Sequence, residues 1–388
     1  MSFNILRVKR HLNCLWSRVR CAAFGSTGLG FDSGVSLYKP EALARSLGVM
    51  CGRELHVLNC PRDTVQDLDL STKTCLITGA NSGIGLEMTR CLISGNCTVL
   101  MACRNLYAAN QAAKQLKGNG DRVKIYEINL ASFKSVQKCI NDILSKEKKI
   151  DIFLVNAGVF GLPWTLTEDN LETIFQVNYL SQFHMILGLE KILAPDARIV
   201  FTSTESHRNI NMNINDRLIL TKNIVSLPEN EYTSIKAYNT SKLCGILAMH
   251  YLSYRWLKTK KTVYCAHPGS FVYTGLSRNW WPYEILYKLM TPFSKSISQS
   301  ASTPLYCATS PEMAGVTDVY YKDLKRCDES HLAQDRHLAF SLYDLSCELI
   351  QERVGIQKPE KVAEPEQPKV TEKVQDTVDE NLEPSYEN

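Results

Sequence analysis

The sequence of 388 residues contains no run of 18 apolar residues and no hydrophobic secretory segment at its N-terminus. A membrane-spanning helix needs about 20 consecutive apolar residues, so we expect none, and we expect a protein that is not secreted. Positive and negative charges nearly balance, since 44 basic and 40 acidic residues give a net charge of only +4. Such a small excess does not indicate nucleic acid as a partner, and none is predicted.

The 14 cysteines form no C-x-x-C motif and no paired spacing typical of zinc ligands. Several lie within apolar runs, among them Cys75, Cys103 and Cys265. A chain of this length can build its own hydrophobic core without a disulfide framework. We therefore predict reduced, buried thiols and no metal site.

The first 31 residues carry five basic residues and no acid. Their apolar residues recur at alternating spacings of three and four, which in a helix would form one apolar stripe beside a basic face. These are Ile5, Val8, Leu12, Leu15 and Val19. Three interpretations are open: a mitochondrial presequence, an amphipathic helix that makes peripheral contact with a membrane, or a disordered basic tail. The predicted location is cytoplasmic or mitochondrial.

One domain is predicted between this segment and the C-terminal tail. Residues 32–70 are interpreted as a linker that ends in a short helix, and the domain covers residues 71–353. Residues 358–388 contain nine acids, four prolines and one aromatic residue. Such a segment cannot bury enough apolar surface to offset the entropy of ordering, so a disordered acidic tail is predicted.

Within the domain, short apolar runs rich in β-branched residues alternate with helical patterns. The runs are typical of strands buried on both faces of a parallel sheet. The predicted strands cover residues 74–78, 97–103, 123–128, 152–155, 198–202 and 262–266, and helical patterns include residues 84–94, 132–145 and 238–257. The alternation predicts an α/β fold, a doubly wound, Rossmann-like parallel sheet in a single domain with flexible extensions.

Three glycines follow the first predicted strand with the spacing G-x-x-x-G-x-G. Glycine lets the backbone turn sharply and approach a pyrophosphate, whose charge then meets the N-terminus of the next helix. The flanking strand and helix favour a dinucleotide site over an ordinary glycine turn. The predicted contacts in this loop are Gly79, Asn81, Ser82, Gly83, Ile84 and Gly85.

The end of the second predicted strand bears on which dinucleotide binds. A site for NAD places an acid near this point, about 20 residues beyond the glycines, to hold the ribose hydroxyls. Here Cys103 takes the acid's position and Arg104 follows. A cation favours the 2′-phosphate, so NADP is predicted, the alternative being that Arg104 is an ordinary surface residue.

Tyr238 and Lys242 lie four residues apart, on one face of a predicted helix. A nearby ammonium group stabilises a tyrosine phenolate and makes the hydroxyl a usable acid or base. A tyrosine and a lysine at this spacing occur by chance on many helices, so the pair alone does not indicate an active site. Other polar residues, however, follow the predicted strands, at the edge where an open parallel sheet binds ligands. These are Asn156, Ala157 and Gly158 after the fourth strand, Asn178 in the next helix, Ser203 and Thr204 after the fifth strand, and Pro268 and Gly269 after the sixth.

Together these motifs resemble the short-chain dehydrogenase/reductases over about residues 70–353, in the family's order and spacing. Within that family the similarity is strongest to the WW-domain-containing oxidoreductases, through LPWTLTEDNLETIFQVN, ESHR and AYNTSKLC. The resemblance implies that Tyr238 transfers a proton, and that Lys242 binds the nicotinamide ribose and lowers the tyrosine pKa. It also implies that Asn178 anchors a water that supplies protons to Lys242.

The resemblance further implies that Asn156 and Gly158 line the adenosine side of the cofactor and that Thr204 holds the substrate. Thr204 stands where the family has serine; its added methyl restricts the side chain, so Ser203 remains an alternative. Asn129-Leu130 stands where aspartate-leucine is usual, and its amide oxygen can still accept from the adenine amino group, without charge.

A WW domain needs two well-spaced tryptophans, whereas residues 1–70 hold only Trp16. No binding of proline-rich motifs is therefore expected. Residues 279–293, NWWPYEILYKLMTPF, are expected to form an apolar cap that suits a lipophilic steroid- or retinoid-like substrate, with plain core packing as the alternative.

We therefore expect an NADP-dependent oxidoreductase that interconverts a carbonyl and an alcohol by hydride transfer, with Tyr238 as the acid/base. The alternative is a catalytically weak cofactor-binding scaffold that acts through protein contacts. Tyr238, Lys242 and Asn178 favour catalysis, whereas Thr204 and Asn129 favour the scaffold. A homodimer is left open.

Overall fold

One sheet forms the centre of the computed structural model, which describes residues 65, 68–116, 122–210, 219–269 and 295–355. Its strands are β1 (Thr74–Thr78), β2 (Thr98–Cys103), β3 (Val123–Glu127), β4 (Ile150–Val155), β5 (Leu193–Thr202), β6 (Thr262–His267), β7 (Val319–Lys322) and β8 (Lys325–Cys327). Their spatial order is β3-β2-β1-β4-β5-β6-β7-β8.

The pairs of neighbouring strands from β3 to β7 are parallel, and the edge strand β8 runs antiparallel to β7. The chain order reverses between β1 and β4, since β2 and β3 extend the sheet one way and β4 to β7 the other. An open α/β sheet binds ligands at the carboxyl ends of the strands beside such a switch point. The topology thus places a site where β1, β4 and β5 end.

Helices cover both faces of this sheet. They are α3 (Gly83–Ser94), α4 (Leu106–Gln115), α5 (Phe133–Lys146), α6 (Thr173–Phe175), α7 (Ser181–Leu189), α8 (Lys222–Val225), α9 (Ser234–Arg255), α11 (Ile297–Thr309) and α12 (Arg336–Val354). A π-helical turn, Gln176–Leu180, joins α6 to α7, and 3₁₀ turns cover Glu190–Ile192, Glu205–Asn209, Glu229–Glu231 and Pro311–Met313. One apolar core joins the strands to α5, α7, α9 and α12, and a second joins them to α3, α4 and α11.

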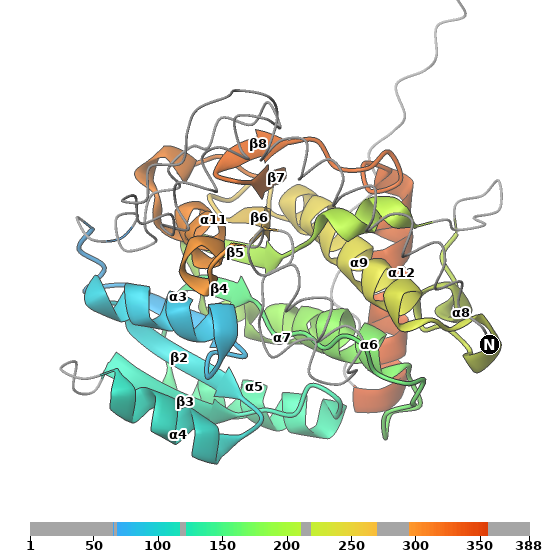
Figure 1. Ribbon diagram of the computed structural model, residues 1–388, viewed down its shortest axis with the longest axis horizontal. Coiled ribbons are helices and arrows are strands. Elements are labelled where there is room, and N and C mark those ends of the chain that lie inside the picture. Colours follow the sequence, from blue (N-terminus) through green and yellow to red (C-terminus); the bar gives the residue numbers. More distant parts are fainter. Residues whose placement is uncertain (1–64, 66–67, 117–121, 211–218, 270–294, 356–388) are drawn as a thin grey trace, which may run out of the picture. The chain divides into compact units, whose positions relative to one another are not determined.

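The C-terminal helix α12 packs along α9, and Figure 1 shows the two helices next to one another. Between them the rings of Tyr251 and Tyr343 stack, with centroids 3.8 Å apart and planes 13° apart. Phe340 meets Tyr251 edge-on, with centroids 5.2 Å apart. The helix that carries the predicted Tyr238–Lys242 pair is therefore held by the end of the domain.

The predicted doubly wound α/β fold is confirmed, and all six predicted strands are present. The largest boundary error is at β5, which begins at Leu193 instead of residue 198. The sequence pattern does not predict β7 and β8, because strands of four and three residues are too short to show an apolar run. The predicted parallel sheet thus gains an antiparallel edge.

Some predicted segments lie outside the described residues: 1–31, most of the linker 32–70, the cap 279–293 and the tail 358–388. The cysteines that the structure describes are all free, and each except Cys327 is buried. No helix in the described ranges is long and apolar enough to cross a membrane. The same ranges contain no group of three or more side chains that could hold a metal ion.

Candidate active site

The glycine loop after β1 has the tight backbone that its spacing predicts. Gly79 and Gly83 have φ angles of +68° and +53°, in the left-handed region that favours glycine. A side chain at Gly85 would place its Cβ 2.3 Å from the carbonyl oxygen of Gly79. The absence of that side chain lets the first turn of α3 pack directly against the loop.

The N-terminus of α3 fits an anionic ligand. Ser82, its N-cap residue, makes no side-chain capping hydrogen bond, and the first turn contains no acid. The free backbone N–H groups in the first turn of α3 carry the positive end of the helix dipole. Ser82 is exposed, and Asn81 and Ile84 are half-buried. This arrangement suits the pyrophosphate of a dinucleotide.

The Asn156-Ala157-Gly158 segment after β4 is fastened to the end of β1. The Thr78 hydroxyl accepts from the backbone N–H groups of Asn156 and Ala157, each at 3.0 Å. The Asn156 side chain donates to the Thr78 carbonyl at 3.0 Å, and Gln182 on α7 donates to the Ala157 carbonyl at 2.9 Å. No sequence motif indicates Thr78 or Gln182, which support the predicted site from β1 and α7.

Arg104 lies directly after β2 and is exposed. No carboxylate among the described residues pairs with it. Cys103 beside it is buried, and burial raises the pKa of its thiol to about 11. A neutral thiol and a guanidinium thus stand where an NAD site would need an acid.

Asn129 is held in a local turn after β3. Its side-chain oxygen accepts from the N–H of Ala131 at 3.2 Å, and its own N–H donates to the Ser135 hydroxyl at 2.9 Å. Leu130 is buried, and its carbonyl accepts from the Ser181 hydroxyl at 2.6 Å. The Asn129 amide oxygen keeps one lone pair for a ligand.

Tyr238 and Lys242 lie on one face of α9, with the Lys242 Nζ 5.6 Å from the centre of the tyrosine ring. Lys242 is only 8% exposed, and its Nζ donates to the Thr202 carbonyl at the end of β5 at 2.7 Å. Burial lowers the pKa of Lys242 to about 8. The lysine therefore stays largely protonated at neutral pH and can stabilise a phenolate.

Asn178 lies in the π-helical turn, a kind of turn that is frequent at functional sites. Its Oδ1 accepts from the N–H of Val159 at 2.7 Å, and its Nδ2 donates to the Val159 carbonyl at 3.1 Å. A Cβ at Gly158 would lie 3.4 Å from Asn178 Oδ1 and 3.9 Å from Lys242 Nζ. The structure thus brings Asn178, Gly158 and Lys242 together.

Ser203 and Thr204 follow β5 directly and are held differently. Ser203 is buried, and its hydroxyl has no hydrogen-bond partner among the described residues. Thr204 is half-buried, and its hydroxyl oxygen accepts from the N–H of Ser206 at 3.3 Å. That contact uses only a lone pair, so the Thr204 O–H can still donate to a substrate. Both hydroxyls remain candidates.

The chain leaves β6 through His267, Pro268 and Gly269, and Gly269 adopts a φ of +118°. His267 is buried, and within the described part of the chain neither ring nitrogen has a partner. Burial lowers its pKa to about 4, so the imidazole is neutral at physiological pH. The predicted Pro268-Gly269 turn is therefore preceded by a buried neutral histidine, which no sequence motif indicates.

Phe160 is a further residue that the motifs do not reveal. It lies two residues beyond Gly158, and its ring meets the ring of Tyr238 edge-on, with centroids 4.9 Å apart and planes 68° apart. An apolar wall thus stands beside the candidate acid. Its position just after the Asn-Ala-Gly segment is the one signal that could have indicated it.

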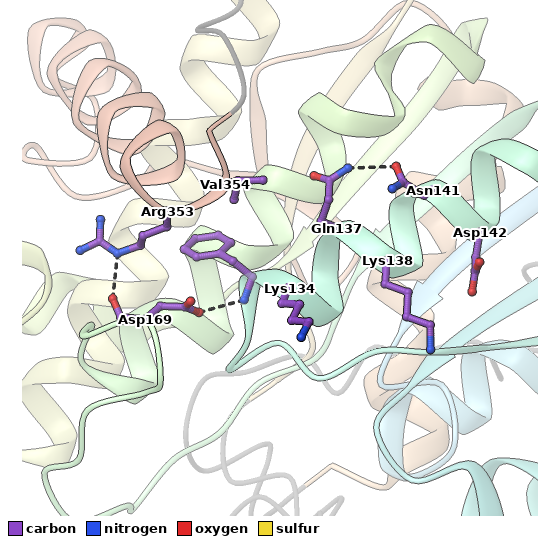
Figure 2. Close-up of a pocket in the computed structure, with 9 residues that line it drawn as sticks. Lys134, Gln137, Lys138, Asn141, Asp142, Asp169, Arg353 and Val354 are labelled. Atoms are coloured by element: carbon purple, nitrogen blue, oxygen red, sulfur yellow. Dashed lines mark hydrogen bonds between the residues drawn. The ribbon is translucent and has the colours of Figure 1, made fainter.

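A cavity of about 500 Å³ lies elsewhere, between α5 and the C-terminal end of α12. Figure 2 shows Lys134, Lys138 and Arg353 among its lining residues, and the Arg353 side chain donates to the Asp169 carbonyl at 2.8 Å. No residue of the glycine loop or of α9 lines it. We assign this cavity no function.

The carboxyl edge of the sheet therefore carries a glycine loop, a tyrosine with a buried lysine, and two hydroxyls. The loop and the switch point define a dinucleotide-binding fold. The tyrosine–lysine pair adds a group that can transfer a proton. These features place the protein in the class of nicotinamide-dependent oxidoreductases.

Comparison with known proteins narrows this class. Residues 73–214 match the family model for short chain dehydrogenase. The WW domain-containing oxidoreductase of Drosophila melanogaster is 39% identical over 290 residues, which cover 74% of this chain and 70% of that protein. Retinol dehydrogenase 12 of Mus musculus is 33% identical over 289 residues, 73% of this chain and 88% of that protein.

A crystal structure of an uncharacterised protein from Mycobacterium paratuberculosis matches with a TM-score of 0.59 and 25% identity, covering 74% of this chain and 97% of the other. The chain belongs to the short-chain dehydrogenase/reductase family, with clear similarity to the WW domain-containing oxidoreductases.

Proposed function

We propose that this protein is an NADP-dependent oxidoreductase that interconverts a carbonyl and an alcohol on a lipophilic substrate. The observation that carries the proposal is the buried Lys242, whose Nζ lies 5.6 Å from the centre of the Tyr238 ring. A buried cation costs free energy unless it is well partnered, and here its one hydrogen bond within the described residues is to a backbone carbonyl. A lysine whose pKa is lowered by burial, next to a tyrosine that can donate a proton, is typical of an active site.

In the proposed reaction each of these residues has a separate role. NADP(H), when bound, supplies or accepts the hydride. During reduction Tyr238 gives its hydroxyl proton to the carbonyl oxygen, and Lys242 stabilises the phenolate that remains. Thr204, or Ser203 in its place, donates a hydrogen bond that orients the same oxygen. Asn178 holds the Asn-Ala-Gly segment beside Lys242.

The preference for NADP(H) over NAD(H) rests on Arg104. One charge-assisted contact to a phosphate contributes roughly 1.5–3 kcal/mol, a factor of about ten to a hundred in affinity. Fluorescence titration should therefore show tighter binding of NADPH than of NADH, and Arg104→Gln should reduce the difference. Lys114→Gln, at the far end of α4, is the control and should leave it unchanged. Equal affinities in the wild-type protein would mean that Arg104 does not contact the 2′-phosphate.

The lipophilic substrate is supported by the Phe160 ring beside Tyr238 and by the relationship to a retinol dehydrogenase. Purified protein with NADPH should oxidise the cofactor in the presence of all-trans-retinal or a steroid ketone. A small polar aldehyde of matched reactivity is the control and should be reduced more slowly. A preference for the polar aldehyde would contradict the proposed substrate class.

The scaffold alternative retains support from Thr204 and Asn129, which depart from the family pattern. It predicts NADPH binding without turnover of any carbonyl compound. The same titration and substrate screen therefore separate the two functions.

For location, we propose that residues 1–31 direct the protein to mitochondria or to a membrane surface. Their basic and apolar residues suit attraction to an anionic membrane and insertion of an apolar stripe. A fusion of residues 1–31 to a fluorescent protein should collect on mitochondria or membranes. A diffuse signal would show that the segment is only a basic tail.

A further inference from the structure

The segment Glu205-Ser206-His207-Arg208 directly follows the two candidate hydroxyls, yet the proposed chemistry gives it no role. It forms the 3₁₀ turn Glu205–Asn209. Of its side chains, that of Glu205 contacts β7 and that of His207 contacts the chain beyond β8. Their contacts determine how the strand end that carries Thr204 is held.

His207 connects Thr204 to the chain beyond β8. It is 1% exposed; its Nδ1 lies 2.6 Å from the Thr204 carbonyl oxygen, and its Nε2 lies 3.1 Å from the backbone N–H of Ser330. A carbonyl only accepts and a backbone N–H only donates, so the ring must carry its proton on Nδ1 and be neutral. Consistent with this, burial lowers the pKa of His207.

Glu205 connects the same turn to β7. Its carboxylate accepts from the Tyr320 hydroxyl at 2.9 Å and lies 3.4 Å from the Lys322 Nζ. Arg208, within the turn, donates to it at 3.2 Å. Tyr320 is fully buried, and its ring lies 5.4 Å from that of His207. Charge-assisted hydrogen bonds of this kind are the stronger ones in proteins.

The end of β5 is also bonded to α9, because Lys242 on that helix donates to the Thr202 carbonyl at 2.7 Å. Residues Thr202 to Thr204 are therefore held from two sides. Lys242 on α9 bonds to Thr202, and the turn that follows Thr204 bonds to β7 through Tyr320. We propose that Glu205 and His207 are positioning residues, which fix the Ser203–Thr204 hydroxyls for the reaction by anchoring them to Tyr320 and Ser330. The inference rests on the proposed function, since it assigns these residues to that reaction.

If this is so, the rate of the chemical step should depend on Tyr320 of β7, although this residue lies outside the proposed reaction. A displacement of about 1 Å at reacting groups can cost on the order of 100-fold in rate. Tyr320→Phe removes one hydroxyl and should lower kcat about tenfold, with the Kd for NADPH unchanged. The matched control is Tyr264→Phe on β6, which removes an equally buried hydroxyl bonded to the Met313 carbonyl at 2.8 Å.

Both variants should lose similar thermal stability, but only Tyr320→Phe should lose kcat. An equal effect of the two variants on kcat would overturn the positioning role. Replacement of His207 gives a second comparison: His207→Gln keeps a donor and an acceptor and should retain more kcat than His207→Phe, which keeps only a ring. Equal kcat in these two variants would also count against it.

A measurement without substrate separates this inference from the proposed function. In protein labelled with ¹⁵N-histidine, His207 at pH 7 should show a protonated Nδ1 and a bare Nε2, assigned by comparison with His207→Gln. A ring protonated on Nε2, or on both nitrogens, would overturn the anchoring even if the enzyme is active. If no carbonyl compound is turned over, the proposed function and with it the positioning role fail, while the spectrum still decides whether His207 anchors the turn.

Discussion

Lys242 reaches from α9 to the end of β5, so that one side chain ties the helix of Tyr238 to the strand that carries the candidate hydroxyls. Its burial has two effects. It lowers the lysine pKa to about 8, and it removes water that would screen the ammonium charge from the tyrosine. At the scale of residues, the site depends on this one partly desolvated charge.

Tyr238→Phe should reduce kcat by a factor on the order of 100 or more, because it removes only the hydroxyl that transfers the proton. The aromatic ring remains, so the Kd for NADPH should stay within about twofold. Turnover is measured by loss of reduced nicotinamide absorbance, and binding by fluorescence titration. Lys242→Ala should weaken both, since we propose that it contacts the ribose as well. Retained turnover in Tyr238→Phe would remove this tyrosine from the mechanism.

The two hydroxyls after β5 can be told apart by substitution. If Thr204 holds the substrate, Thr204→Ser should preserve or raise kcat, and Thr204→Ala should lower it by about 100-fold, the cost of one transition-state hydrogen bond. Ser203→Ala should then have little effect. The reverse pattern would assign the role to Ser203, whose hydroxyl is buried without a partner in the described chain.

At the scale of elements, α12 supports α9, the helix that carries Tyr238 and Lys242. It packs along α9 through the stacked rings of Tyr251 and Tyr343. Such a pair contributes both its buried area and a geometry-dependent ring contact. The C-terminal helix therefore belongs to the folded domain, although no cofactor motif lies in it.

Tyr343→Ala should destabilise the domain by roughly 3–5 kcal/mol, as expected for the loss of a large buried ring. Tyr343→Phe keeps the ring and is the control, with an expected cost below about 1.5 kcal/mol. Urea unfolding followed by circular dichroism measures both. Equal losses in the two variants would show that the hydroxyl, and not the stacked ring, holds α12 on α9.

At the scale of the whole molecule, buried neutral histidines make stability depend on pH. Burial lowers the pKa of His184 to about 4, while the unfolded chain has a histidine pKa of about 6.5. The unfolded state therefore binds the proton first as pH falls. The contribution of His184 is fully present above about pH 6.5 and is lost as pH falls toward 4.

Between pH 7 and pH 5 this one group should cost the wild-type protein about 2 kcal/mol of unfolding free energy. His184→Gln should lose less stability over the same interval, since the titrating group is gone. His331→Gln, at an exposed position, is the control and should behave as the wild type. Urea unfolding at the two pH values gives the differences, and identical pH dependence in all three proteins would contradict the burial argument.

The sequence alone determined the elements whose signal is local. Apolar runs of four to seven residues identified the strands from β1 to β6, because a strand covered by helices on both faces needs such a run. The outer strand β3 is the exception, since Lys124 and Glu127 within it are exposed. The glycine spacing, the Tyr238–Lys242 interval and the polar residues after each strand identified the candidate site, because parallel strands bring their carboxyl ends to one edge.

Only the tertiary structure decided what holds that site in place. Thr78 with Gln182, His207 with Ser330, and Glu205 with Tyr320 are pairs separated by more than 100 residues. Each pair consists of ordinary polar residues, and no spacing along the chain marks them as partners. The short strands β7 and β8 likewise have no recognisable pattern in the sequence, since their pairing depends on the strand already in place beside them. Local periodicity reports what each segment buries, whereas the partner that satisfies a buried polar group is set by the folded chain as a whole.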